Sequence, residues 1–135
     1  MRSSAKLLVL HSFSALILAG CAATTLPEFE AEQTDRDVIA DASTQTDIDP
    51  GSTRFVGEVE GAELYIARGD NDTLCLIAIR DQEWEQTGCG SGLGIGTELQ
   101  GGSRIEAGSF KFPDSEVADG ERTKLSESVT VITYP

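Results

Sequence analysis

Histidine is almost absent from this chain of 135 residues, because the only one is His11, near the N-terminus. A Ser-His-Asp or Cys-His catalytic set needs a histidine, and none follows position 11. Cysteine is scarce too: there are three, at positions 21, 75 and 89, and no two are spaced as Cys-x-x-Cys. Zinc sites built from histidine or clustered cysteine are therefore excluded, and we expect neither a metal nor another cofactor.

Positive charge is also in short supply. Ten Lys and Arg residues face 23 Asp and Glu residues, which gives a net charge of −13. Nucleic acids and anionic lipids are recognised through Lys and Arg that face phosphate groups. The composition therefore excludes nucleic-acid binding and a polybasic attachment to membranes, and mutual repulsion favours a monomer.

No apolar run is long enough to cross a membrane, which takes about 20 residues. The most apolar stretch, residues 7–18, is preceded by Arg2 and Lys6 and followed by the small residues Ala19 and Gly20. A positive start, a short apolar run and a small-residue junction are typical of a secretory signal peptide. We therefore expect residues 1–20 to direct export.

Residues 18–21, Leu-Ala-Gly-Cys, resemble the lipobox of bacterial lipoprotein signal peptides. The resemblance implies cleavage before Cys21, a diacylglycerol group on its sulfur and acyl chains such as palmitate. Two acyl chains give a stable membrane attachment, at about 0.8 kcal/mol for each buried CH₂. Ordinary signal cleavage a residue or two later is the alternative. Removing residues 1–20 takes away two bases and no acid, so the net charge becomes −15.

Residues 21–50 are polar and acidic, with eight acids and a single base. Low hydrophobicity and high net charge favour disorder, and like charges extend the chain. We expect this segment to be a flexible acidic tether, lipidated at its first residue, that lifts a domain of residues 51–135 off the membrane. A short helix from Pro27 toward Ala40, capped by Thr25, is the competing interpretation.

After residue 51, short apolar runs alternate with turn sequences. Residues 73–80, Thr-Leu-Cys-Leu-Ile-Ala-Ile-Arg, are the best strand candidate in the chain. Gly-Asp-Asn-Asp at positions 69–72 has the residue types of a hairpin turn. Residues 63–68 and 73–80 are therefore expected to pair as antiparallel strands.

Further strands are expected at residues 103–112 and 128–134, and a polar loop at residues 113–124. The fold class predicted is mainly β, a small antiparallel sheet or barrel-like domain with one disulfide.

That disulfide follows from the assignment of Cys21 to lipid, which leaves Cys75 and Cys89 as an even pair in an exported protein. A hairpin of residues 73–80 and 84–89 brings the two cysteines opposite each other. The paired positions are then Arg80 with Trp84, Ile79 with Glu85, Ile77 with Thr87, and Cys75 with Cys89. Directly opposed Cα atoms lie about 4.5 Å apart, close enough for a disulfide. Closing a loop of this length contributes about 3 kcal/mol.

Two motifs that suggest ligand sites are incomplete. Residues 88–96, Gly-Cys-Gly-Ser-Gly-Leu-Gly-Ile-Gly, match neither Gly-x-Gly-x-x-Gly nor a phosphate loop, so a loop or bulged strand is expected. Asp70-Asn71-Asp72 lacks the spacing of a calcium loop and is expected to be a solvated turn.

Residues 49–79, followed by Trp84 and by Gly-Cys-Gly-Ser-Gly at positions 88–92, are similar to small exported proteins of Actinobacteria. The shared features are an Arg-x-Val-Gly start, a Cys-Leu strand, the Trp and a second Cys before glycines. Residues 123–132 resemble the last strand of those proteins. The resemblance implies a location in the cell envelope and a disulfide, and no particular chemistry.

The expected function is that of an exported, lipid-anchored cell-envelope protein facing outside the cytoplasm. Its domain is expected to bind an envelope protein or a cell-wall component without catalysis. The alternative is a carboxylate-based hydrolase of cell-wall polysaccharide, because 15 acids follow residue 51 and a catalytic pair among them remains open.

Overall fold

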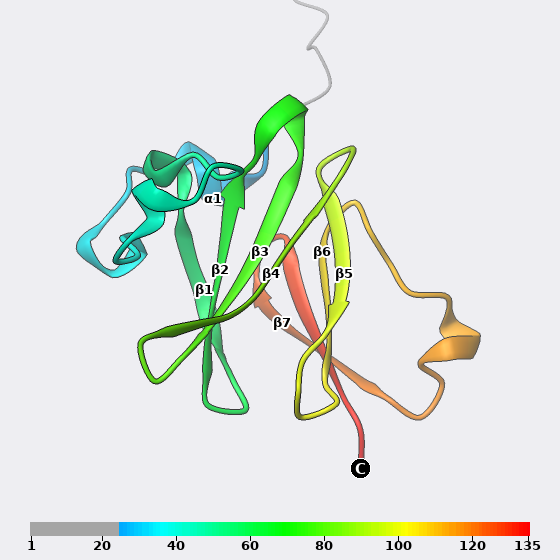
Figure 1. Cartoon of the computed structure of the whole chain (residues 1–135). Helices are drawn as coiled ribbons and strands as arrows, with labels where there is room; N and C mark the ends of the chain where they lie inside the picture. The colour runs from blue at the N-terminus through cyan, green and yellow to red at the C-terminus, as the bar shows by residue number, and fades with distance from the viewer. Residues whose placement is uncertain (1–24) are drawn as a thin grey trace, which may run out of the picture.

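Two antiparallel sheets of four strands face each other in the computed structural model, which describes residues 25–135 (Figure 1). The first sheet has the order β1-β2-β3-β4 and the second the order β5-β6-β8-β7. The strands are β1 (Arg54–Val59), β2 (Ala62–Arg68), β3 (Leu74–Arg80), β4 (Glu83–Gly90), β5 (Gly94–Glu98), β6 (Arg104–Gly108), β7 (Glu121–Ser126) and β8 (Val129–Thr133). The expected mainly β fold is confirmed.

The main core fills the space between the two sheets. Its side chains alternate along the strands, as a sheet with one face toward a core requires. Fully buried examples are Leu64 and Ile66 of β2, Leu74 of β3, Ile105 of β6 and Val129 of β8. Each such side chain contributes about 1.5–3 kcal/mol by leaving water.

The outer face of the first sheet is buried as well, under the N-terminal segment of residues 25–53. Tyr65, Ala67, Ile77 and Ile79 form a second core with three apolar residues of that segment: Ile39, Ala42 and Ile48. Because β3 is covered on both faces, it forms a continuous apolar run in the sequence instead of an alternating one.

The flexible tether expected over residues 21–50 is wrong for residues 25–50, which are folded onto the sheet. Three apolar residues within a polar segment provide the cover that the outer face needs. The backbone is fixed as well: Asp49 N–H donates to the Arg68 carbonyl at 2.9 Å, and Ile48 bridges to Gly69. Residues 21–24, including Cys21, lie outside the described residues.

The competing helix is present only as the single turn α1 (Pro27–Glu30), with Pro27 in the first turn as expected. Leu26 is the N-cap rather than Thr25, and Ala31 is already extended. The rest of the segment forms 3₁₀ turns at Asp35–Asp37, Ala42–Thr44 and Pro50–Ser52.

Both expected hairpins of the first sheet are present. β2 pairs with β3 as predicted from the turn at positions 69–72. In the next hairpin Ile77 pairs with Thr87, and Cys75 with Cys89, as expected.

Near the turn between β3 and β4 the expected register is wrong. The observed pairs are Arg80 with Glu83 and Ile79 with Trp84. The turn has two residues, Asp81 and Gln82, whose φ angles of 52° and 65° fit a type I′ turn. Glu85 is left as the extra residue of a bulge, and this bulge brings the register back before Ile77.

One strand lies where a loop was expected. β7 covers residues 121–124 of the segment 113–124 that was read as polar loop. It is the edge strand of the second sheet, and its first four residues are exposed. An edge strand without a buried face shows no apolar alternation, so its sequence resembles a loop.

The glycines of residues 88–96 allow close approach between segments. Gly88 and Gly90 lie in β4, and Gly94 and Gly96 lie in β5, with a turn between the strands. A Cβ on Gly90 would lie 2.2 Å from the Gly94 carbonyl oxygen, and one on Gly96 would lie 2.0 Å from the Phe110 ring. The expected loop or bulged strand is thus present only as the turn between Gly90 and Gly94, and the flanking glycines lie in strands without a bulge at these positions.

Candidate functional site

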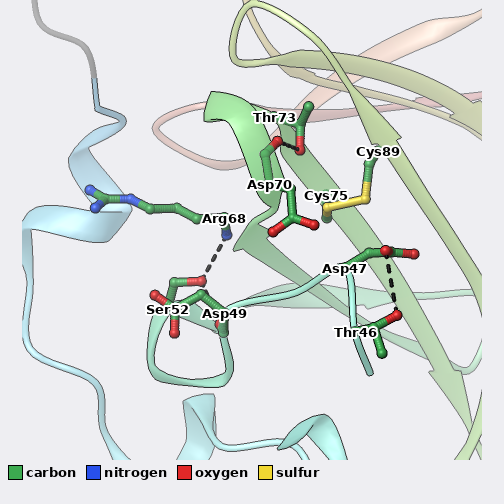
Figure 2. The surroundings of a disulfide bond; sticks show 9 residues. All are labelled: Thr46, Asp47, Asp49, Ser52, Arg68, Asp70, Thr73, Cys75 and Cys89. Carbon is green, nitrogen blue, oxygen red and sulfur yellow. Dashed lines mark hydrogen bonds between the residues drawn. A yellow bond between two sulfur atoms is a disulfide. The ribbon is translucent and has the colours of Figure 1, made fainter. Parts of the chain in front are cut away.

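The disulfide between Cys75 and Cys89 is present, with an S–S distance of 2.04 Å and a Cα–Cα distance of 4.0 Å. Figure 2 shows it joining β3 and β4, with Thr46 and Asp47 of the N-terminal segment beside it. Cys75 is fully buried, whereas Cys89 is exposed. The bond therefore joins a residue of the second core, Cys75, to the edge strand β4.

Gly69 shows how tightly the chain packs around this bond. A Cβ on Gly69 would lie 2.7 Å from Cys75 Sγ and 2.3 Å from Thr73 Oγ1. The Asp47 carbonyl oxygen would be 3.1 Å away on another side. The Cys75 side of the bond is therefore closely packed, as is typical of a structural crosslink.

A cleft lies between the N-terminal segment and the first sheet, with a cavity volume of about 350 Å³. Residues 35–40 form one wall, and β2, the end of β3 and the start of β4 form the other. The lining residues are Asp35, Arg36, Val38, Ile39, Ala40, Glu63, Tyr65, Ile79, Gln82 and Trp84.

Apolar side chains line much of this cleft. Val38 is 57% exposed. Among the residues that the structure describes, Val38 and Tyr134 are the large hydrophobic side chains that remain exposed. Trp84 is half-buried, and its Nε1–H donates to the Ala40 carbonyl at 3.4 Å, which orients the indole toward the wall formed by residues 35–40.

The polar side of the cleft is an ion pair joined by a phenol. Arg36 Nη1 lies 3.1 Å from Glu63 Oε1, and the Tyr65 hydroxyl donates to Glu63 Oε2 at 3.1 Å. The Arg36 guanidinium also stacks 3.9 Å from the centre of the Phe55 ring. Both oxygens of Glu63 are therefore occupied by donors from the protein itself.

Tyr65 is not suited to act as a base. Burial raises the pKa of its phenol above the usual 10.0, and the hydrogen bond to Glu63 and the negative charge of that residue raise it further. The phenol therefore stays protonated at neutral pH and serves as a donor.

Asp37 holds in place the wall of the cleft that residues 35–40 form. Its carboxylate accepts hydrogen bonds from Thr34 N–H at 2.8 Å and from Phe55 N–H at 2.9 Å. It thereby joins the first 3₁₀ turn of the N-terminal segment to β1. Arg36 and Val38, on either side of it in the chain, are held at the cleft as a result.

Metal ligation has no support among residues 25–135, where no group of three or more His, Cys, Asp or Glu side chains is placed to hold an ion. Asp70, Asn71 and Asp72 form an exposed turn, with positive φ at Asn71 and Asp72. In the same part of the chain, no helix combines the length and apolarity that a membrane crossing needs.

The cleft was not predicted from the sequence as a site. Trp84 was noted as a hairpin position and as part of a resemblance, and Val38 lay in a segment interpreted as a tether. Glu63 and Asp35 were two acids among many. The only signal that could have found the cleft is the presence of apolar residues 38 and 39 within an acidic segment.

Comparison with known proteins identifies no relative: no protein-family model matches the chain, and neither the curated proteins nor the solved structures contain a match.

Proposed function

We propose that this protein is a lipid-anchored component of a bacterial cell envelope whose cleft beside Trp84 binds a partner without catalysis. The sequence Leu-Ala-Gly-Cys at residues 18–21 supports the anchor. The disulfide of Cys75 and Cys89 fits an oxidising compartment outside the cytoplasm.

The observation that carries the binding role is an open apolar surface on a sheet that is otherwise covered. Complete burial of an exposed apolar side chain gains about 1.5–3 kcal/mol, and burying Val38 and Trp84 against a partner would gain part of that for each, because Val38 is 57% exposed and Trp84 is half-buried. Tryptophan and arginine, both present here, are enriched among residues that dominate binding energy. The volume of about 350 Å³ is at the lower end for ligand pockets, so it suits one side chain or one sugar ring.

A hydrolase of cell-wall polysaccharide is the alternative function, because two acids, Asp35 and Glu63, line the cleft. Glycoside hydrolysis needs one carboxyl group as acid and another as base or nucleophile. Arg36 and Tyr65 occupy both oxygens of Glu63, which favours a structural role for it and binding over hydrolysis.

A photo-reactive amino acid in place of Val38 tests the binding role in intact cells. A matched variant carries the same group in place of Asp119, which is exposed in a loop of the second sheet. We expect crosslinking to one envelope protein or wall fragment from position 38 only, and its loss when Trp84→Ala is added. Equal crosslinking from both positions, or no effect of Trp84→Ala, would contradict the proposal.

The hydrolase alternative has its own readout. Incubation with purified cell wall is expected to release no soluble fragments. Release that is abolished by Glu63→Gln would favour the hydrolase instead.

Mass spectrometry of the membrane-extracted protein tests the anchor. The expected N-terminal peptide begins at Cys21 and carries the mass of a diacylglycerol group. The Cys21→Ser variant is expected to carry no acyl group and to be absent from the membrane fraction. A mature protein that begins after Cys21 would contradict the anchor.

A further inference from the structure

The described chain begins at a fixed point on the fold. Thr25 Oγ1 accepts a hydrogen bond of 2.5 Å from Arg68 at the end of β2, and the Arg68 guanidinium lies 5.0 Å from the centre of the Phe29 ring. Glu28 Oε1 accepts from Ser128 N–H at 2.6 Å, which ties α1 to the second sheet. The chain is therefore held by the domain from its first described residues onward.

This attachment shortens the distance available between a lipid on Cys21 and the domain. Four residues of chain lead from Cys21 to Thr25, and they span at most about 14 Å when fully extended. A flexible coil reaching to residue 50 would have spanned roughly 30 Å. A lipid on Cys21 thus holds Thr25 close to the membrane surface.

Thr25 lies at one end of the first sheet. A small hollow there is lined by Thr25, Arg68, Gly69, Asp72, Thr73 and Leu93. These residues come from the end of β2, the turn that leads into β3 and the turn between β4 and β5 (Figure 1). We call this the anchor end.

The cleft lies toward the opposite end of the same sheet. Glu63 pairs with Ile79, and Ile79 pairs with Trp84, so these three residues form one row across β2, β3 and β4. Along β2, Glu63 and Arg68 are five residues apart, which corresponds to about 17 Å at ~3.4 Å per residue. The row of residues that contains Trp84 is therefore about 17 Å from the row that contains Arg68, at the anchor end.

We infer that the anchor end rests at the surface of the lipid bilayer and that the cleft is held toward the far end of the sheet, away from the membrane. The inference rests on the proposed lipid on Cys21. The short segment between Cys21 and Thr25, the leash, keeps the anchor end at the membrane. Electrostatic attraction to anionic lipid does not contribute, because Asp70 and Asp72 lie at this end and the net charge after residue 20 is −15. The partner of the cleft then approaches from the side of the cell wall.

The chain contains one tryptophan, so the emission of Trp84 reports the position of the cleft without added labels. The full lipidated protein is reconstituted into phosphatidylcholine vesicles that carry a nitroxide quencher on the lipid headgroup. A matched variant combines Trp84→Phe with Ser91→Trp, which moves the only indole to the exposed turn between β4 and β5 at the anchor end. Strong quenching is expected for the indole at position 91 and little for Trp84.

A second variant, made in the same Trp84→Phe, Ser91→Trp background, tests whether the short leash sets the position of the domain. Twenty Gly and Ser residues inserted before Thr25 lengthen the leash, and quenching at position 91 is expected to fall severalfold. Equal quenching at the two positions in the short-leash protein would overturn the inference while leaving the anchor in place. Protein that stays in the supernatant when the vesicles are pelleted, with no acyl mass on Cys21, would overturn the anchor and this inference together.

Discussion

Arg54, at the start of β1, directs its guanidinium group at backbone carbonyls instead of at a carboxylate. It donates to the carbonyls of Ala31 at 2.8 Å, Thr53 at 2.9 Å, Glu28 at 3.1 Å and Gly51 at 3.2 Å. The residue is only 9% exposed. At the scale of single residues, it is the main polar link between the N-terminal segment and the sheet.

Replacing Arg54 by Met is expected to leave these carbonyls without donors in a poorly hydrated site. An unsatisfied buried acceptor costs about 1–3 kcal/mol, so the variant should lose roughly 3 kcal/mol of the free energy of unfolding. Urea unfolding followed by circular dichroism measures the loss. Lys124→Met removes the same charge from an exposed ion pair, with side chains 60% and 70% exposed, and should change stability by less than about 1 kcal/mol.

The lowered pKa of Asp37 makes the stability of the fold depend on pH. Burial alone would raise the pKa of its carboxyl group, but hydrogen bonds from the backbone of Thr34 and Phe55 outweigh that effect and hold the pKa below 3.8. The unfolded chain therefore binds the proton more readily than the folded chain. The contribution of Asp37 is fully present above about pH 4 and is lost as the pH falls through its lower folded value.

The Asp37→Asn variant should accordingly be less stable than the native protein at pH 7, by about 1–3 kcal/mol for the lost charged hydrogen bonds. The difference should shrink as the pH is lowered below 4. Urea midpoints measured from pH 7 to pH 2 provide the check. Asp119→Asn, at an exposed loop position, serves as the control, and a gap that widens in acid would contradict the account.

Among the elements, the β3–β4 hairpin depends on its disulfide. Replacing Cys75 and Cys89 together by Ala in a Cys21→Ser background should lower the free energy of unfolding by about 3 kcal/mol. Reductant should lower the urea midpoint of the parent and leave the double variant unchanged. A parent that is insensitive to reductant, or that shows two free thiols before reduction, would contradict the crosslink.

The same hairpin shows what could be predicted from the sequence. The apolar run of β3 and the turn before it were enough to place β2, β3 and the Cys75–Cys89 pairing. The bulge at Glu85 could not be predicted. A three-residue turn without a bulge and a two-residue turn followed by a one-residue bulge both place Cys89 opposite Cys75. β7 was missed because an edge strand with exposed residues carries no apolar pattern.

The N-terminal segment was misjudged for a different physical reason. Composition averages over a segment, and the average of residues 21–50 is that of a disordered chain. Folding depends on where Ile39, Ala42 and Ile48 lie relative to an uncovered sheet, which is a tertiary property. The cleft beside Trp84 could not be found for the same reason, since its two walls come from segments distant in the sequence.

For the molecule as a whole, the central consequence is that the acidic segment belongs to the domain. It covers the outer face of the first sheet, forms one wall of the cleft and fixes the chain at Thr25. Only four residues of chain would then separate an anchor on Cys21 from a domain that includes the cleft. A flexible tether would let the cleft face in any direction.

Amide hydrogen exchange of the full chain, read by mass spectrometry over peptides from residues 34–53, tests this claim most directly. The N–H groups of Asp37, Ala42, Asp49 and Ser52 all donate to backbone carbonyls. We predict that they are protected, that Asp49 exchanges as slowly as the amides of β2, and that Arg54→Met speeds their exchange. Exchange across these peptides at the rate of an unstructured chain, while β2 and β3 remain protected, would contradict the account.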